Sequence, residues 1–412
     1  MRKLIYIDSS YSLRQIRDQS LDQVLKLRSL DGFFQAVWSA HPLDTNPSSH
    51  PGIAACGPTV TTKIGPNHYF ISGRYGRFKR LTWLPVFNAS LALLLFILKL
   101  VKVALTERIR VVRSGDPLLC GLIGLIVSRL SGAALVVRVN GNHDWVRATT
   151  GKPLSARLFH NARVEIWVEK LVLSHANRVI LYCENHKQFA ISKGAKPGCI
   201  TVIRHGNLIE PLHFIKPSLR IPPADLHIRN KLRQRRWMVH VGRLEKVKHA
   251  MDCYDVLFEL ARLGSNVGLI LVGDGSLRGT ISSRADSDGL DERILFTGNV
   301  DQVYLASLLP YCTLALSPIT GRALAEVAFA ALPVVAYDLD WQSELIETDI
   351  TGILVPALDI KAMVEGAARF LADSALCTKL GESLRVRALN MLDPQTQTLN
   401  EIEVYSNLGV LQ

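Results

Sequence analysis

Short apolar runs alternate with longer amphipathic segments along this chain of 412 residues. The amphipathic segments predict helices, among them Glu165–His175, Asp252–Leu263 and Ile360–Leu371. Strands alternating with helices are typical of βαβ units and parallel sheets, so we expect an α/β fold. The runs predict strands at Lys3–Ile7, Tyr69–Ser72, Arg110–Arg113, Leu135–Val139, Val179–Tyr182, Ile200–Arg204, Trp237–Val241, Gly268–Val272, Ile294–Phe296, Leu314–Leu316, Val334–Tyr337 and Ile353–Val355.

The length of the chain favours two domains. A proline-rich, basic segment separates the two series of strands. We therefore predict an N-terminal Rossmann-like domain at 1–205, a linker at 206–236 and a C-terminal Rossmann-like domain at 237–385. A tail at 386–412 follows, and its return onto the N-terminal domain stays open. In doubly wound sheets, ligands bind beyond the carboxyl ends of the strands.

Charge divides the chain in two. The net charge is +12, but residues 1–236 hold 35 Lys+Arg and 13 Asp+Glu (+22), whereas 237–412 hold 13 and 23 (−10). A basic half is compatible with nucleic acid, an anionic membrane surface or a phosphate-rich substrate. Because no helix-turn-helix, zinc finger or interleaving of aromatic and basic residues is present, nucleic acid is not an expected partner.

One stretch, 84–98, is almost wholly apolar and has basic neighbours, among them Lys79, Arg80, Lys99 and Lys102. Three interpretations stay open: a buried helix, a helix lying in the membrane interface with anionic lipid around it, and a membrane span. The stretch is short for a span and contains Asn88.

Cysteine spacing and the amino terminus bear on the compartment. The seven cysteines are scattered without metal-ligand spacing, which fits a reducing compartment and predicts no metal. The first residues read as a strand and not as a signal peptide. We therefore expect a cytoplasmic protein, with peripheral attachment to the inner face of the cytoplasmic membrane as an option.

Three segments of the second half could hold a phosphorylated ligand. Val241–Lys248 follows a strand and carries an arginine and a lysine that could bind phosphates. A second strand ends in the turn Gly273–Gly275. The third segment, Ser317–Glu326, leads into an apolar helix whose first amides could bind phosphate. Each segment also fits an ordinary turn, and Glu326 could pair with an arginine or accept hydrogen bonds from a ligand's vicinal hydroxyls.

Taken in order, these segments resemble a known family. GRLEKVKH, LVGDG, FTG and TGRALAEVAFAALPVVAYD are similar to the motifs of the GT-B retaining glycosyltransferases, the large family-four or glycosyl transferases group 1 type. The similarity is strong over 236–360, weaker over 165–210, and only architectural before that. It implies a GT-B fold, with two Rossmann-like, doubly wound domains facing a central cleft that closes around the donor.

The resemblance assigns roles in binding the donor. Arg243 and Lys248 match the pair that neutralises the diphosphate, and the turn formed by Gly321, Arg322 and Ala323 matches the loop whose amides meet the donor sugar and phosphate. As the leaving group departs, negative charge builds on the diphosphate, and fixed cations and amides stabilise it.

The resemblance also concerns the nucleoside. Glu326 matches the second glutamate of the family motif, which binds the ribose, and Gly273 and Gly298 fall in turns of the nucleotide pocket. The family retains the anomeric configuration. It needs no metal and no cofactor besides the nucleotide-diphosphate sugar, because arginine and lysine supply the positive charge.

The chain departs from the family pattern at several positions. Pro318 stands where the first glutamate, which helps to position the donor sugar, is usual. His249 replaces the glycine that usually follows the lysine, and Ala331 and Leu332 stand where the family has a glycine before Pro333.

The N-terminal domain offers a candidate catalytic loop. The family has a histidine after a central strand, and here Asn140 holds that position, with His143 three residues further on and Asp144 beside it. We take Asn140, His143 and Asp144 as catalytic candidates. A histidine satisfied by local contacts is the alternative.

The expected function is that of a hexosyltransferase. It moves a hexose-type sugar from a nucleotide-diphosphate sugar to a glycan or lipid-linked acceptor in envelope or exopolysaccharide synthesis, with retention. Because Pro318 and Asn140 replace expected groups, a catalytically impaired, glycosyltransferase-like binding or scaffold subunit is the alternative. Neither the base and sugar of the donor nor the acceptor follows from the residues.

Overall fold

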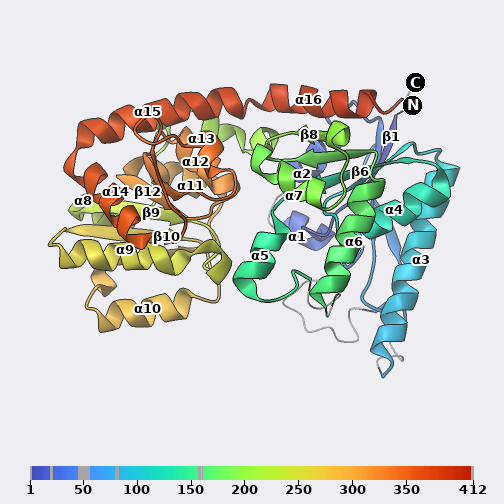
Figure 1. Ribbon diagram of the computed structural model, residues 1–412, viewed down its shortest axis with the longest axis horizontal. Coiled ribbons are helices and arrows are strands. Elements are labelled where there is room, and N and C mark those ends of the chain that lie inside the picture. The colour runs from blue at the N-terminus through green and yellow to red at the C-terminus, as the bar shows by residue number, and fades with distance from the viewer. Residues whose placement is uncertain are drawn as a thin grey trace. The chain divides into compact units, whose positions relative to one another are not determined.

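A computed structural model describes residues 2–18, 22–44, 56–78, 83–155, 159 and 161–409. Lys79, Arg80 and the last residues of the predicted tail, 410–412, lie outside this range. The chain forms two compact units. Unit 1 comprises Met1–Ile203 together with Thr398–Gln412, and unit 2 comprises Arg204–Gln397. Figure 1 shows both units as α/β structures with helices packed around a sheet.

Unit 1 is built on a sheet of eight strands in the order β3-β4-β2-β1-β5-β6-β7-β8. All neighbouring strands are parallel except the edge pair β3 and β4. The order reverses between β1 and β5, which makes the carboxyl ends of these two strands the switch point at which doubly wound folds bind ligands. The strands are β1 (Lys3–Ile7), β2 (Ala36–His41), β3 (Val60–Gly65), β4 (His68–Ser72), β5 (Val111–Ser114), β6 (Ala134–Val139), β7 (Arg178–Leu181) and β8 (Ile200–Val202).

Helices α3, α4 and α6 form one layer against this sheet. Phe96 and Leu100 of α3, Ile123 of α4 and Val172 of α6 are buried in a single apolar core with strand residues such as Val112. Two short helices, α1 and α2, connect β1 to β2. The helices are α1 (Leu13–Asp18), α2 (Asp22–Leu27), α3 (Pro85–Thr106), α4 (Leu119–Ser131), α5 (His143–Thr150), α6 (Ala162–His175) and α7 (Lys187–Ser192).

The last helix, α16 (Pro394–Ser406), completes a second core of unit 1. Its Tyr405 is fully buried against Phe34, with ring centroids 5.0 Å apart. Arg113 of β5 forms a buried ion pair with Glu401 of the same helix. Burial alone would lower the pKa of Arg113, but Glu401, Tyr405 and Tyr6 together outweigh burial and hold that pKa above its usual value. Removing either partner of such a buried ion pair would leave the other charge buried without compensation and would lower the stability of the unit.

Unit 2 is built on six parallel strands in the order β11-β10-β9-β12-β13-β14. The order reverses between β9 and β12, so the second switch point lies at the carboxyl ends of these strands. Every residue of β10 is buried, as expected for the centre of a parallel sheet. The strands are β9 (Arg236–Val241), β10 (Val267–Val272), β11 (Ile294–Gly298), β12 (Leu314–Ser317), β13 (Val334–Tyr337) and β14 (Ile353–Val355).

Apolar helices cover the sheet of unit 2. Leu257 of α9 and Met363 and Phe370 of α14 are buried in one core with strand residues such as Leu269. The helices are α8 (Leu226–Gln234), α9 (Ala250–Arg262), α10 (Arg278–Ser287), α11 (Gln302–Leu308), α12 (Arg322–Phe329), α13 (Gln342–Leu345), α14 (Ile360–Ala372) and α15 (Ser374–Met391).

The predicted α/β fold with parallel sheets is confirmed. The sequence analysis missed β2 and β3, which are the second strand and the antiparallel edge of unit 1. Residues 206–236, for which the sequence predicts a linker, lie within unit 2 and include α8. The predicted start of the tail, residue 386, lies inside α15.

The helix predicted over 84–98 is present but longer, as α3. By length and composition it is the one helix in the described ranges that could cross a membrane, and it takes part in the core through only one face.

Two departures from the family glycines occur where the backbone is left-handed. His249 has φ +54° and Ala331 has φ +53°. Ala331 follows the last turn of α12, and its amide donates to the carbonyl of Ala328 at 3.0 Å. Glycine is favoured at such a helix end because a side chain there crowds the backbone. The structure thus explains the family glycines that this chain lacks.

We predict that Ala331→Gly raises the free energy of unfolding of unit 2 by about 1 kcal/mol, because it relieves the left-handed strain. Hydrogen exchange of the β13 amides, measured against denaturant, checks this value. Ala330→Gly is the matched control, since Ala330 has φ −81° and should lose about 0.5–1 kcal/mol on becoming glycine. A loss of stability in both variants would contradict the explanation.

Candidate functional site

A pocket of about 500 Å³ opens at the carboxyl ends of the unit 2 strands. It lies at the switch point between β9 and β12, where a doubly wound sheet binds its ligand. Most of the predicted donor-binding residues line it. They are Arg243 and Lys248 from the turn after β9, Gly273 from the turn after β10, and Gly321, Arg322, Ala323 and Glu326 from the start of α12.

Backbone hydrogen bonds join the turns that follow β9, β10 and β11. The Gly242 amide donates to Val272 O at 2.9 Å, and the Gly273 amide donates to Gly298 O at 2.9 Å. Gly273 has φ +128°, and a Cβ there would lie 2.1 Å from the Gly242 carbonyl oxygen. Only glycine permits this approach, so the LVGDG motif is required for packing whatever the ligand. Gly298 supports the Gly273 turn from β11.

The two cations of the first turn differ in environment. Arg243 is exposed, whereas Lys248 is partly buried beside it. Burial lowers the pKa of Lys248, and Arg243 lowers it further, while Asp340 acts in the opposite direction. The two neighbouring cations therefore repel each other across the pocket wall. An anion bound between them would relieve this repulsion.

The side chain of Gln342, which is fully buried, forms hydrogen bonds with the backbone of the turn after β12. Its Nε2 lies 2.9 Å from the carbonyl oxygens of both Ser317 and Pro318, and its Oε1 accepts from the Thr320 amide at 3.1 Å. Trp341 adds a hydrogen bond from Nε1 to Thr320 O at 3.3 Å. The turn that carries Pro318 is thus fixed by side-chain amide and indole groups. The sequence analysis missed Gln342, because nothing in its sequence neighbourhood indicates that it reaches back to β12.

The start of α12 offers free amides to the pocket. Gly321 is the cap residue, and no side chain satisfies the first amides of this helix. Such a helix end attracts anions, since its amides and its dipole both favour negative charge. A Cβ on Gly321 would meet no atom within 4 Å, so the residue leaves space at the pocket.

Glu326 lies one turn into α12 and is only 3% exposed. Burial raises its pKa, while Arg322 opposes the shift through a hydrogen bond from Nε to Oε1 at 3.1 Å. Glu326 therefore has the arginine partner that the sequence analysis considered, and it lines the pocket as well. The two interpretations are compatible in this geometry.

Three further polar residues, which the sequence analysis did not single out, line the pocket. They are His205, Asn299 and Gln302. Asn299 and Gln302 follow β11, so their position at the strand ends could have been inferred from the alternation of elements. His205 is the last residue of the predicted N-terminal domain but lies in unit 2, and no sequence signal points to it.

Unit 1 also has polar groups at the carboxyl ends of its strands, near the switch point between β1 and β5. A Cβ on Gly115 would lie 2.9 Å from Asp8 Oδ1, so the carboxylate sits directly against this glycine. The exposed Asn140, which follows β6, donates from Nδ2 to Gly115 O at 3.0 Å and accepts from Arg138 Nε at 3.1 Å. Asn140 thus lies at the carboxyl end of the sheet, close to Asp8 and Gly115.

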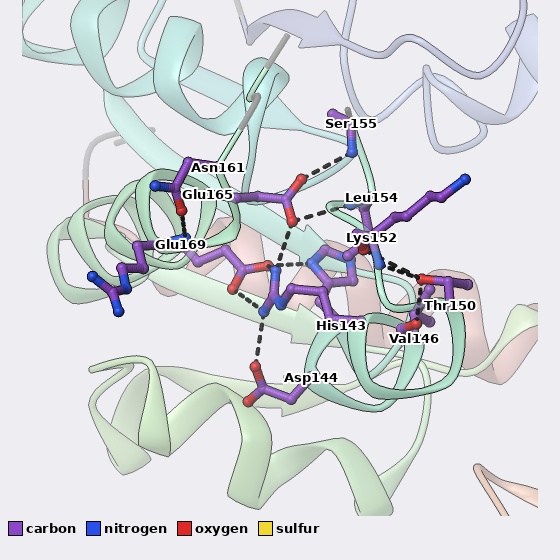
Figure 2. Close-up of polar contacts among 12 residues, drawn as sticks. His143, Asp144, Val146, Thr150, Lys152, Leu154, Ser155, Asn161, Glu165 and Glu169 are labelled. Atoms are coloured by element: carbon purple, nitrogen blue, oxygen red, sulfur yellow. Dashed lines mark hydrogen bonds and ion pairs between the residues drawn. The ribbon is translucent and has the colours of Figure 1, made fainter. Parts of the chain in front are cut away.

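His143 begins α5 and is 8% exposed. Its Nδ1 lies 2.5 Å from Glu169 Oε1, and Figure 2 shows the imidazole beside this carboxylate. Arg147 also binds the same carboxylate, with Nη2 2.7 Å from Oε2. Although burial acts to raise the pKa of Glu169, hydrogen bonds from His143 and Arg147 outweigh it and lower that pKa. The imidazole orientation is therefore fixed by a buried, ionised glutamate.

Asp144 is turned toward other partners. Its Oδ1 accepts from Arg147 Nη2 at 2.8 Å and from Lys193 Nζ at 2.7 Å. Burial acts to raise the pKa of Asp144, but these two cations lower it overall. The candidates Asn140, His143 and Asp144 thus belong to one loop but engage three different sets of partners. The structure gathers the predicted residues of unit 2, except Gly298, into one pocket and does not gather those of unit 1 in this way.

Comparisons with known proteins agree with the motifs. Residues 225–387 match the family model of glycosyl transferases group 1. The chain is 25% identical over 264 residues to an alpha-D-kanosaminyltransferase of Streptomyces kanamyceticus, covering 63% of this chain and 66% of that protein. It is 26% identical over 208 residues to an N-acetyl-alpha-D-glucosaminyl L-malate synthase of Bacillus anthracis, covering 45% and 53%. The chain thus matches less than two thirds of the length of these curated relatives.

Solved structures share the fold over the whole chain. A sucrose-phosphate synthase from Thermosynechococcus elongatus superposes with a TM-score of 0.75 at 18% identity, covering 100% of both chains. Anabaena HepE, in a complex with UDP-glucose, gives a TM-score of 0.67 at 17% identity and covers 99% of this chain and 100% of its own. At these identities the structures show the fold, which is the two-domain GT-B fold of glycosyltransferases. The family match covers residues 225–387, and the shared fold extends over both units.

Proposed function

We propose that this protein transfers a hexose-type sugar from a nucleotide-diphosphate sugar to a glycan or lipid-linked acceptor, with retention of configuration. One observation carries the proposal. The unit 2 pocket combines two cations, Arg243 and Lys248, with the uncapped start of α12 and the buried carboxylate of Glu326. A nucleoside diphosphate needs positive groups for its phosphates and a hydrogen-bond acceptor for its ribose hydroxyls, and this pocket offers both.

In this proposal the diphosphate lies between Arg243 and Lys248 and faces the amides of 321–323. Breaking the bond to the sugar leaves a further negative charge on the diphosphate. Fixed cations and amides stabilise that charge more than they stabilise the bound donor, which lowers the barrier to transfer. These residues of the chain supply the charge stabilisation, and the proposal assigns no step to a metal.

Glu326 is the proposed partner of the nucleotide ribose. Its carboxylate accepts hydrogen bonds from the two vicinal hydroxyls when it is ionised. Arg322, at 3.1 Å, opposes the rise in the pKa of this carboxylate that burial causes. HepE, which shares the fold, has been solved with UDP-glucose, and this supports a donor of the same chemical class here.

We assign a catalytic role in unit 1 to the loop 140–144, with His143 first. Glu169 holds the imidazole Nδ1, which leaves Nε2 as the nitrogen that can act on a substrate. Asn140 is positioned at the sheet edge by Gly115 and Arg138. Asp144 is the weakest of the three candidates, because Arg147 and Lys193 already neutralise it.

The proposed setting is envelope or exopolysaccharide synthesis on the cytoplasmic side of the membrane. The name of one relative, a phosphatidyl-myo-inositol mannosyltransferase, describes transfer to a lipid. This supports a lipid-linked acceptor as one option alongside a glycan.

A binding or scaffold subunit without turnover is the second candidate function. Pro318 favours it, because the turn after β12 carries no carboxylate to position the donor sugar. Under this alternative the pocket binds the nucleotide but no acceptor receives the sugar. Measurement of donor binding and of transfer on the same preparation separates the two functions.

We predict that Arg243→Ala and Lys248→Ala each lower the rate of sugar transfer by about 100-fold, because each removes a cation that stabilises the departing diphosphate. The rate is followed as nucleotide release from a panel of UDP-, GDP- and ADP-sugars. Lys246→Ala is the matched control, since Lys246 lies in the same turn but is exposed and outside the pocket lining. Variants at Arg243 and Lys248 that match the wild type would refute the assignment.

We predict that Glu326→Gln abolishes the preference for a ribonucleotide over its 2′,3′-dideoxy analogue, because only the ionised carboxylate binds both hydroxyls. Burial raises the pKa of Glu326. As the pH is lowered, the nucleotide affinity of the wild type should therefore begin to fall at a higher pH than it would if this glutamate were exposed, with a pKa near 4.3. The variant should not show this dependence. Calorimetry with both nucleotides at several pH values measures both effects, and Glu365→Gln on the exposed face of α14 is the control.

We predict that His143→Ala lowers the turnover number by about 100-fold while the dissociation constant of the nucleotide stays within about twofold, because general acid–base and positioning contributions have this size. His175→Ala, an exposed histidine of the same unit, should have no effect. Thermal melting of each variant is measured in parallel. Unchanged turnover with a lowered melting temperature would mean that the His143–Glu169 contact serves stability alone.

A further inference from the structure

Helix α3 turns apolar side chains toward solvent as well as toward the core. Its buried face includes Phe96 and Leu100, which pack against the sheet. On the opposite face Phe87, Leu94 and Leu98 are 58%, 52% and 50% exposed. These three, spaced seven and four residues apart, lie on one side of the helix. A helix on the surface of a water-soluble domain usually presents polar residues there.

The polar residue near the start of α3 points inward. Asn88 is 3% exposed, and its Oδ1 accepts from the amides of Arg77 and Phe78 at 2.7 and 2.8 Å. The beginning of the helix therefore has a polar interior and an apolar exterior. This inversion distinguishes α3 from a core helix with a few exposed leucines.

An apolar tip precedes the helix and forms its first turn. Trp83 is 72% exposed and Val86 77% exposed, and Leu84 lies between them at 40%. In the view of Figure 1 the first turns of α3 extend beyond the neighbouring helices. Tryptophan is the residue most characteristic of the boundary between water and lipid. We call Trp83, Val86, Phe87, Leu94 and Leu98 the α3 apolar face.

Helix α6 contributes a second aromatic group at the same end of unit 1. Trp167 is 60% exposed and Val164 47% exposed, both in its first two turns. Helices α3 and α6 precede the parallel strands β5 and β7, so their starts lie at the end of the sheet where the strands finish. The apolar tip and Asn140 therefore lie at the same end of unit 1.

The charges on this helical layer are of one sign. Among the described residues of α3, α4 and α6 the exposed charges are Lys102, Arg129, Arg163 and Lys170. The carboxylates of this layer are Glu165 and Glu169, and both are fully buried against Arg147. Glu107, just after α3, is paired with Lys3 at 2.8 Å. An anionic surface is the complement of such a layer.

The helix lies on a surface and does not span a bilayer. Its length and composition would suffice for a span, but Phe96 and Leu100 are in the core of unit 1, and removing α3 would expose that core. Lys99 and Lys102 lie within its last two turns. A partly buried amphipathic helix with flanking cations is typical of proteins that bind in the interface of a bilayer.

We propose that the α3 apolar face, with Trp167 beside it, docks unit 1 onto the surface of an anionic lipid bilayer. The bilayer contacts Trp83, Val86 and Phe87 most deeply, and Lys102 and Arg163 bind its headgroups. This inference rests on the proposed function for its biological purpose. The end of the sheet that carries Asn140 lies at the same end of unit 1 as the deepest part of this contact, so an acceptor anchored in lipid meets the strand ends close to the bilayer surface.

Vesicle sedimentation tests the docking with the full chain. We expect binding to phosphatidylcholine vesicles that contain phosphatidylglycerol, and at least tenfold weaker binding to pure phosphatidylcholine. The variant Phe87→Ser/Leu94→Gln/Leu98→Gln should bind at least tenfold more weakly, since three side chains that would enter the lipid are lost. Lys102→Glu and Arg163→Glu should each weaken binding about fivefold or more.

A matched control removes equally exposed apolar groups elsewhere. Leu263→Gln/Leu358→Gln/Leu399→Gln replaces leucines that are 74%, 61% and 65% exposed. This variant should bind vesicles as the wild type does. Equal loss in both triple variants, or binding that ignores phosphatidylglycerol, would overturn the proposal. So would a wild-type dimer in sedimentation velocity that becomes monomeric in the α3 variant without any vesicle binding, because the face would then join two copies of the chain.

Nucleotide calorimetry on the same proteins separates this inference from the proposed function. The α3 variant should keep wild-type affinity for nucleotide, because all residues of the donor pocket lie in unit 2. Loss of vesicle binding with normal nucleotide affinity supports the docking surface. Vesicle binding by a wild type that binds no nucleotide would support docking and refute the proposed function.

Discussion

Just beyond the carboxyl end of a central strand, the backbone N–H and C=O groups no longer have hydrogen-bond partners in the neighbouring strands. The donor pocket depends on how unit 2 satisfies these groups. After β9, β10 and β11 the turns bond to one another, which is possible because Gly273 lets the Gly242 carbonyl approach. After β12 the partner is a side chain, the buried amide of Gln342. The turns are therefore fixed before any ligand binds, and fixed groups are the ones that stabilise charge most effectively.

The same constraint explains what could be predicted from the sequence. Central strands such as β10 are continuous apolar runs, and the turn glycines recur because the strand ends approach closely, so the strands of unit 2 were predictable to within a few residues. The departures from the family glycines were explained only by the backbone conformation, because the residue types histidine and alanine do not indicate that His249 and Ala331 have positive φ. Gln342 was missed because its partners in the turn after β12 lie more than twenty residues away in the sequence, with α12 and β13 between them.

Unit 1 was less predictable for a different reason. Its candidate loop is organised by long-range pairs of charged groups, such as His143 with Glu169 and Asp144 with Lys193. Local periodicity predicted the helix that carries Glu169 but not the element that it faces. The strand β2 has no alternation to mark it, because all six of its residues are buried and include polar ones such as Ser39 and His41. The basic surplus of this half, in turn, became informative only once the buried carboxylates were set apart from the exposed cations.

The pairing of Arg113 with Glu401 sets the order in which the two units can be completed during synthesis. Unit 1 begins with the first strand, yet its second core needs Tyr405 and its buried arginine needs Glu401, and both residues follow unit 2 in the chain. Unit 2, which runs from Arg204 to Gln397, is a continuous segment and emerges entirely before then. The unit that starts first is therefore finished last, and until α16 arrives Arg113 lacks the carboxylate that pairs with it.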